Sequence, residues 1–316
     1  MKDTYGREID YLRISLTDLC NLRCVYCMPP EGVDKRAHGS MLTLEETEEI
    51  ARAAVGLGIK KIRLTGGEPL VKRGITQLCR ALSEIGGLEE LTITTNGILL
   101  PKMAKELKAA GVDRVNISLD TLDREKYARL TRGGSLDDAL AGIQAAREAG
   151  FENIKLNAVL IGGVNDDEIA ALAALTVDEP LEMRFIELMP IGHSPFPKEA
   201  YISAEAVLDA LPELRPLNLC RGVAELYALP GAAGTVGLIR PMSCDFCRRC
   251  SRLRLTADGY IKTCLHTEKE TPLRGLHGDE LTQALKKAIE NKPLRRGELS
   301  FEEHSAAGRS MNEIGG

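Results

Sequence analysis

The feature that most constrains the fold is a repeated alternation of short strand-like and helix-like segments between residues 12 and 211. The predicted strands are Leu12–Thr17, Lys61–Thr65, Leu91–Thr95, Arg114–Leu119, Ile154–Leu160 and Leu181–Leu188. The predicted helices are Leu44–Leu57, Ile75–Ile85, Pro101–Ala109, Leu136–Ala149, Asp166–Leu175 and Ala204–Leu211. Capping signals such as Thr43 with Glu46 mark helix starts, and glycines such as Gly58 mark helix ends. Six consecutive strand–helix units predict an α/β fold with a parallel sheet under helices, either open or closed into a barrel.

The predicted strands differ from ordinary buried parallel strands, which are apolar throughout. Most of them alternate, so one face is apolar and the other carries polar side chains. Five side chains on the polar face are cations: Arg13, Lys61, Arg63, Lys155 and Arg184. Buried cations need partners and the net charge of the chain is −5, so this face predicts an anionic small molecule inside a barrel-like sheet. The alternatives are strands that face solvent at an edge, or long side chains that extend out to water.

The pattern changes after about residue 220, where short β-prone runs, Leu226–Leu229 and Thr235–Ile239, are followed by one more helix, Glu280–Glu290. We therefore expect a barrel region over residues 1–222 and a small C-terminal α+β region over residues 223–316. The negative charge argues against a nucleic-acid binder. No run approaches the roughly 20 apolar residues of a membrane helix, and the polar N-terminus lacks a secretory signal, so we expect a cytoplasmic protein.

Three of the nine cysteines, Cys20, Cys24 and Cys27, follow the first predicted strand, at the sheet edge where active sites of parallel α/β proteins collect. A four-iron cluster normally takes four cysteines, so three would leave one iron open to a substrate. The alternative is a zinc site, for which His38 is the nearest candidate fourth ligand.

The spacing of these cysteines, with Tyr26 before the last one, resembles the radical S-adenosylmethionine superfamily. The segment Gly66-Gly67-Glu68-Pro69 after the second strand resembles the glycine-rich motif of that superfamily. The resemblance implies a partial (β/α)6 TIM-like barrel, a [4Fe–4S] cluster held by Cys20, Cys24 and Cys27, and cleavage of S-adenosylmethionine to a radical that abstracts hydrogen. It also makes six residues candidates for binding this cofactor: Tyr26, Gly67, Glu68, Asn96, Ser118 and Asn157.

A second group of cysteines comprises Cys244, Cys247, Cys250 and Cys264, with His266 beyond. Alone, it would make a plausible zinc site, but in a protein that already carries a cluster we favour a second cluster. The remaining cysteines, Cys79 and Cys220, are interpreted as ordinary core or loop thiols.

The context of the second group resembles the GTP 3′,8-cyclase family. The resemblance is carried by Phe246–Gly259, by Arg184–Pro190 and by the ending Met311-x-x-Ile314-Gly315-Gly316. It implies conversion of GTP to (8S)-3′,8-cyclo-7,8-dihydroguanosine 5′-triphosphate, the first step of molybdopterin (molybdenum cofactor) biosynthesis.

The same resemblance assigns roles to residues of this chain. A second [4Fe–4S] cluster on Cys247, Cys250 and Cys264 would hold guanine at its open iron. The triphosphate would meet some combination of Arg13, Lys61, Arg63, Lys155 and Arg184. Arg252 and Arg254, on one face of a strand, would contact substrate. The tail residues Gly315 and Gly316 would reach into the active site, where the alternative is simple disorder.

Two residues depart from the family pattern. Cys244 would close the open iron if it were a ligand, so we predict that it is not one. Ser251 stands where the family often has asparagine. Expected partners are GTP, a flavodoxin- or ferredoxin-type electron donor and cyclic pyranopterin monophosphate synthase, with a homodimer left open. The competing hypotheses are a peptide-modifying radical maturase and a zinc-bearing binding module.

Overall fold

The computed structural model describes residues 1–33, 38–191, 196–244, 246–297, 299 and 308–315. Its strands are β1 Tyr11–Ser15, β2 Lys61–Thr65, β3 Glu90–Thr95, β4 Arg114–Ser118, β5 Lys155–Leu160, β6 Glu182–Glu187, β7 Arg215–Arg221, β8 Ala224–Ala228, β9 Thr235–Ile239, β10 Arg252–Leu255, β11 Tyr260–Lys262 and β12 Thr271–Pro272. Its α-helices are α1 Leu44–Gly56, α2 Ile75–Ser83, α3 Leu100–Ala109, α4 Arg124–Thr131, α5 Leu136–Glu148, α6 Ile169–Ala174, α7 Glu205–Ala210 and α8 Gly278–Glu290.

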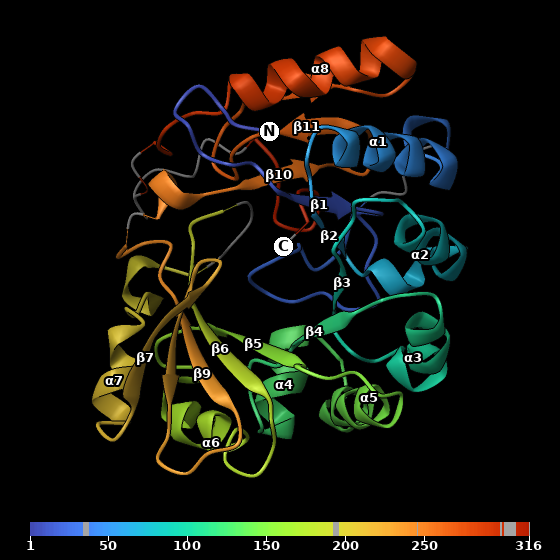
Figure 1. The fold of residues 1–316 in the computed structure, drawn as a ribbon. Coiled ribbons are helices and arrows are strands. Elements are labelled where there is room, and N and C mark those ends of the chain that lie inside the picture. The colour runs from blue at the N-terminus through green and yellow to red at the C-terminus, as the bar shows by residue number, and fades with distance from the viewer. Residues whose placement is uncertain (34–37, 192–195, 245, 298, 300–307, 316) are drawn as a thin grey trace.

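All the strands form one sheet in the order β12-β11-β10-β1-β2-β3-β4-β5-β6-β9-β8-β7. The run from β10 through β1 and β6 to β9 is parallel, and the outer strands at both ends are antiparallel. The order has two ends, so the predicted barrel is partial and open. Figure 1 shows the sheet curving around the marked C-terminus, with helices on its outer side.

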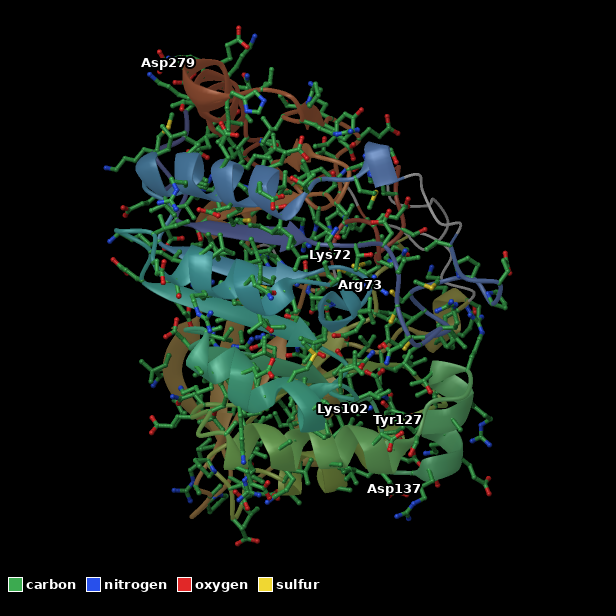
Figure 2. The ribbon with its side chains drawn as sticks, turned by 90° about the vertical axis from the view of Figure 1, so that its right-hand side faces the viewer. Lys72, Arg73, Lys102, Tyr127, Asp137 and Asp279 are labelled. Atoms are coloured by element: carbon green, nitrogen blue, oxygen red, sulfur yellow. The ribbon has the colours of Figure 1, made fainter. Side chains whose placement is uncertain are left out.

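The outer face of the sheet is the apolar face predicted from the strand alternation. Leu12, Ile62, Ile93 and Ile117 are completely buried there in the main hydrophobic cluster of the described residues. Helices α1, α2, α3 and α5 stack side by side over this face (Figure 2). The helices therefore exclude water from one side of the sheet and leave the polar side chains on the other.

Several elements differ from the sequence predictions. Helix α4 was not predicted, although Asp123 caps its N-terminus by accepting from the amide of Lys126. The helix expected from Asp166 starts as a short 3-10 turn, Asp166–Glu168, before α6. Strands β7, β11 and β12 were also missed. No helix among the described residues is long and apolar enough to cross a membrane.

The C-terminal region adds strands to both sides of the barrel wall. Strand β9 pairs with β6, and β10 pairs with β1, so residues beyond 223 flank the first six strands. The division into regions 1–222 and 223–316 stays a prediction, because both regions share one sheet.

A glycine in α5 sets how closely the helices approach the turn after β3. A Cβ at Gly142 would collide with the carbonyl oxygen of Gly97, and Gly97 follows the candidate cofactor residue Asn96. A Gly142→Ala variant is therefore expected to lose about 1–3 kcal/mol of unfolding free energy, because the backbone must move. The matched control is Gly56→Ala in α1, where nothing lies within 4 Å of the new Cβ and no loss is expected. Urea unfolding of both variants measures the difference, and an unchanged Gly142→Ala variant would contradict this account of the packing.

Candidate active site

The concave side of the sheet encloses a cavity of about 840 Å³ that is lined by the first cysteine group, by the second group except Cys244, and by the predicted cations. The predicted site residues that line it are Arg13, Cys20, Cys24, Tyr26, Cys27, Lys61, Arg63, Gly67, Glu68, Asn96, Ser118, Lys155, Asn157, Arg184, Cys247, Cys250, Arg252, Arg254 and Cys264. Gly315 lies beside this cavity, against Thr65 and Ser15. Gly316 and Asp245 lie outside the described residues, and so does the side chain of His38.

The two cysteine groups lie at opposite ends of the strands. Cys20, Cys24 and Cys27 follow the carboxyl end of β1. Cys250 precedes the amino end of β10, which runs parallel to β1. Cys264 follows β11, which is antiparallel to β10, so it returns to the same end as Cys250. The polar face of the sheet therefore extends from the first cysteine group to the second.

The thiols of the first group are buried close to one another. Burial raises the pKa of Cys20 to about 11, and burial together with the charge of Cys20 raises the pKa of Cys27 to about 12. Burial and the neighbouring Cys27 also raise the pKa of Cys24. Such thiols ionise when a cation binds them, so this donor set fits a metal cluster.

The glycine-rich segment packs against the loop that carries the first cysteines. A Cβ at Gly67 would collide with the carbonyl of Leu19 and approach that of Asp18 to 2.7 Å. The amide of Glu68 donates to the Leu19 carbonyl at 2.8 Å. These glycines are therefore required for contact between two backbone segments, in addition to any contact with a cofactor.

The carboxylate of Glu68 is occupied within the protein. It accepts from the Leu70 amide at 3.0 Å, the Thr95 hydroxyl at 2.7 Å and the Asn96 amide at 2.8 Å. Burial raises the pKa of Glu68 to about 7. These contacts tie the loops after β2 and β3 together, and the cofactor contact suggested by the sequence stays a prediction.

Asp120 is a residue of this end that the sequence analysis missed. Its carboxylate accepts from the Tyr26 hydroxyl at 2.6 Å and from the Val159 amide at 2.9 Å. It therefore fixes the aromatic ring between Cys24 and Cys27. The only sequence signal was its position just past the end of β4, and burial raises the pKa of Asp120 to about 6.

Three further cofactor candidates lie on adjacent strand ends. The side-chain nitrogen of Asn96 donates to the side-chain oxygen of Asn21, the neighbour of Cys20 in the chain, at 2.8 Å. Ser118 and Asn157 are register neighbours on β4 and β5. Among the described residues, the buried Asn157 Oδ1 and Thr94 Oγ1 have no hydrogen-bond partner, which leaves polar capacity for a ligand.

Two cations, Arg7 and Lys292, donate hydrogen bonds to backbone carbonyls at and beside the second cysteine group. The Arg7 guanidinium donates to the Cys247 carbonyl at 2.8 Å. Lys292 donates to the Arg252 carbonyl at 2.8 Å and to the Thr263 carbonyl, which immediately precedes Cys264. Burial opposes ionisation of Cys250, but Arg252 and Lys292 outweigh it and the pKa of this thiol lies at about 7.

Cys244 and His266, the two further residues of the second group, differ in whether they line the cavity. Cys244 is half-buried and is not among the residues that line the cavity. His266 lines it, and burial together with Arg296 lowers its pKa to about 4, so the imidazole is neutral at pH 7.

Between the two ends lies a cation belt, defined as Arg254, Arg13, Arg63, Arg114, Lys155 and Arg184. Strand register places Arg254 beside Arg13, and Arg13 beside Arg63. Burial and the neighbouring Arg254 lower the pKa of Arg13, and burial and Arg252 lower that of Arg254 to about 10. The local environment therefore disfavours this concentration of positive charge unless an anion joins it.

Some of these cations have carboxylate partners inside the protein. Glu182 accepts from Lys155 at 2.7 Å and also pairs with Arg184. Arg114, which the sequence analysis did not select, pairs with Glu90 at 2.7 Å. Lys61 lies at the rim, with nearly half of its side chain exposed, 3.4 Å from Asp10.

The C-terminal tail enters the same cavity. Arg254 donates to the carbonyls of Ile314, at 3.1 Å, and Gly315. Ile314 is 1% exposed, and a Cβ at Gly315 would collide with the Thr65 hydroxyl. The side-chain amide of Asn312 donates to the Asp18 carbonyl at 3.3 Å, beside the first cysteine loop. The described part of the tail is therefore docked.

The arrangement of the cysteines at each end indicates whether they suit a single metal ion or a cluster. Within residues that the structure describes, no three His, Cys, Asp or Glu side chains converge around a single metal ion. Each end nevertheless supplies three cysteines to one cavity, with cations or unpartnered acceptors beside them. These residues fit [4Fe–4S] clusters, which are held by thiolates.

Comparison with known proteins assigns both halves of the chain. Residues 14–176 match the Radical SAM superfamily, and residues 181–298 match the family described as Molybdenum Cofactor Synthesis C. Among solved structures, SuiB of Streptococcus suis superposes with a TM-score of 0.64 at 18% identity, covering 91% of this chain and 67% of that one. At that identity the likeness shows the fold alone.

Full-length relatives are much more similar. A GTP 3′,8-cyclase of Peptoclostridium acidaminophilum is 53% identical over 99% of this chain and 98% of its own length. One of Pelotomaculum thermopropionicum is 52% identical over 100% of both chains. The two domain matches and these relatives agree with the motifs and with the two-ended cavity, and the chain belongs to the GTP 3′,8-cyclase family of the radical S-adenosylmethionine superfamily.

Proposed function

We propose that the cavity carries out the reaction for which the GTP 3′,8-cyclase family is named. GTP is converted to (8S)-3′,8-cyclo-7,8-dihydroguanosine 5′-triphosphate, with a new bond between C3′ of the ribose and C8 of guanine, at the start of molybdenum cofactor biosynthesis. The observation that carries this proposal is the cation belt between two cysteine groups inside one cavity. A ligand that satisfies it must be strongly anionic and must lie between the two ends.

At the first end, Cys20, Cys24 and Cys27 hold a [4Fe–4S] cluster. When bound, this cluster and S-adenosylmethionine supply the one-electron chemistry that removes the 3′ hydrogen of the ribose. The protein's own contribution is orientation and exclusion of water. Asp120 fixes the Tyr26 ring, while Asn157 offers a buried acceptor that no donor in the described part of the chain uses.

At the second end, Cys247, Cys250 and Cys264 would hold the auxiliary [4Fe–4S] cluster, which would supply a binding position for guanine. Three observations support this assignment. The three thiols line the cavity, Cys244 does not, and Lys292 and Arg252 stabilise the Cys250 thiolate. A fourth thiol ligand would remove the place for guanine.

The triphosphate binds along the cation belt. Arg13, Arg63 and Arg254 are register neighbours and so form a continuous positive surface. Guanidinium groups suit phosphate because their planar donors match its oxygens. Arg252 interacts with the Cys250 thiol and lies over the Phe246 ring at 5.4 Å, and this position beside the second cysteines supports a contact with guanine.

The remaining assignments concern other molecules. An electron donor of the flavodoxin or ferredoxin type reduces the clusters, and the product passes to cyclic pyranopterin monophosphate synthase. A cytoplasmic location stays a prediction, and the homodimer stays open.

The experiment that tests the function is an anaerobic assay on reconstituted protein with dithionite, S-adenosylmethionine and GTP. We expect 5′-deoxyadenosine to form only with GTP present, together with a cyclised nucleotide. Arg252→Ala and Arg254→Ala should each lower kcat/KM about ten-fold or more, because a charge-assisted hydrogen bond contributes about 1.5–3 kcal/mol. Arg248→Ala is the control, since Arg248 is exposed and does not line the cavity. Cleavage of S-adenosylmethionine that ignores GTP would instead favour the peptide-modifying alternative.

Iron content separates Cys244 from the cluster ligands. Wild-type protein and Cys244→Ser should both bind about eight irons per chain, as two four-iron clusters require. Cys247→Ser should lose about half of that iron, because one of three ligands is gone. The measurement is iron and sulfide analysis after anaerobic reconstitution. Loss of iron in Cys244→Ser would overturn the open-iron assignment.

Lys155 gives the site a pH dependence. Burial and the neighbouring Arg184 lower the pKa of Lys155 to about 7, so its positive charge is present below that pH and is lost above it. Affinity for GTP should therefore weaken from pH 6 to pH 8.5 more in wild type than in Lys155→Arg, whose guanidinium stays charged. Calorimetric titration of both proteins with GTP measures this, and the comparison cancels ionisation of GTP itself. Parallel pH profiles would remove Lys155 from phosphate binding.

A further inference from the structure

A partly buried cluster of charged residues around Arg309 lies outside the cavity described above. Arg309 donates to both carboxylate oxygens of Asp258 at 3.0 Å and to both of Glu270 at 2.7 Å. Its guanidinium also lies over the Tyr260 ring at 5.3 Å. The side chains of Arg309, Asp258 and Glu270 are 14%, 13% and 16% exposed.

This geometry is unlike that of an ordinary surface ion pair, which contributes little because it is mobile and solvated. Glu270 makes a bidentate pair with the guanidinium through Nε and one terminal nitrogen, while the other terminal nitrogen donates to both oxygens of Asp258. The aromatic ring covers one face of the guanidinium. The arginine is therefore held in a defined position and orientation.

The partners of Arg309 belong to the structural unit that carries Arg254. Asp258 lies in the turn between β10 and β11, and Tyr260 begins β11. Glu270 directly precedes β12, which pairs with β11. Arg254 lies on β10, so one small antiparallel unit holds both the start of the tail, at Arg309, and its end, at Ile314 and Gly315.

The chain between these two contacts is short. The five steps from Arg309 to Ile314 can span at most about 17 Å. They are further compacted by a turn in which the Ser310 amide donates to Glu313 at 2.9 Å and the Glu313 amide returns to the Ser310 carbonyl at 3.0 Å. The turn keeps Ile314 close to Arg309, so fixing Arg309 limits how far the carbonyls of Ile314 and Gly315 can move from Arg254.

We propose that Arg309 is a positioning residue for the reaction: clamped between Asp258 and Glu270, it fixes the start of the tail so that the Ile314 and Gly315 carbonyls meet Arg254 inside the cavity. Arg309 touches no reacting group and acts through the tail. The inference rests on the proposed function and on the prediction, made from the family resemblance, that the tail residues Gly315 and Gly316 reach into the active site.

The test compares wild type, Arg309→Met and Arg309→Lys as reconstituted full-length holoenzymes. Arg309→Met keeps the length of the side chain and removes the clamp, whereas Arg309→Lys keeps a charge without the bidentate contacts. The control is Arg124→Ala, which breaks an exposed bidentate pair with Asp137 on α4 and α5, away from the tail.

Two measurements are made on each protein. The first is the rate at which a carboxypeptidase removes the terminal glycines, followed by mass spectrometry of the intact chain. The second is the separation of kcat from KM for GTP, with iron content and melting temperature recorded alongside.

In Arg309→Met we expect trimming at least about ten-fold faster and kcat lower by about 10²-fold, the scale of a misplaced positioning group, with KM for GTP and iron content unchanged. Arg309→Lys should fall between this variant and wild type, and Arg124→Ala should match wild type. Wild-type trimming or wild-type kcat in Arg309→Met would overturn the proposal.

Two further arms keep the result unambiguous. If Arg309→Met fails to fold, Asp258→Asn removes one of the two carboxylate charges while leaving Arg309 in place, and the same directions of change are required of it. If wild-type holoenzyme fails to convert GTP, the proposed function fails, whereas the trimming rates still decide whether Arg309 anchors the tail.

Discussion

The central constraint on this structure is the positive charge that it buries on the concave face of a parallel sheet. Strand register forces Arg254, Arg13 and Arg63 into adjacent positions, and none of the three can turn outward because the other face is filled by the helix-covered core. Within the belt, Glu182 pairs with Lys155 and Arg184, and Glu90 pairs with Arg114. Such an arrangement is unfavourable until a polyanion bridges the cations, so the fold itself selects for a ligand with several negative charges.

The direction of the strands explains how two sulfur sites can act on one molecule. Parallel strands of five or six residues separate their ends by about 16–20 Å. The first cysteines follow β1, whereas Cys250 precedes β10 and Cys264 follows the antiparallel β11. An extended nucleoside triphosphate together with S-adenosylmethionine suits that span. The antiparallel β10–β11 hairpin therefore brings Cys264 back beside Cys250, at the end of the strands opposite the first cysteines.

The sequence predicted much of this arrangement because period-two alternation assigns residues to faces directly. The belt residues Arg13, Arg63 and Lys155 were placed correctly for that reason. The sequence could not show how each polar group is used. Glu68 was expected at the cofactor, yet its carboxylate accepts three hydrogen bonds from neighbouring loops. Asp120 was missed because its partner Tyr26 lies 94 residues away in the chain.

Long-range pairing also explains the other omissions. Arg309 follows a polar stretch with no periodicity, and its partners Asp258 and Glu270 read as ordinary turn and loop residues. Helix α4 is largely polar, so its signal lay only in the capping Asp123. Local patterns therefore gave the elements and their faces, whereas contacts between distant segments needed the structure.

Likeness in fold to SuiB, at 18% identity, does not decide the chemistry of this chain. The contacts that this chain makes with Arg254 bear on that chemistry more directly. The tail contacts this arginine through the carbonyls of Ile314 and Gly315, which are dipoles without net charge. A carboxylate in that place would neutralise the arginine, whereas carbonyls orient it and leave its charge available for phosphate. A side chain at Gly315 would collide with Thr65, so glycine is the residue that permits this contact. The described part of the tail can therefore lie against Arg254 without neutralising its positive charge.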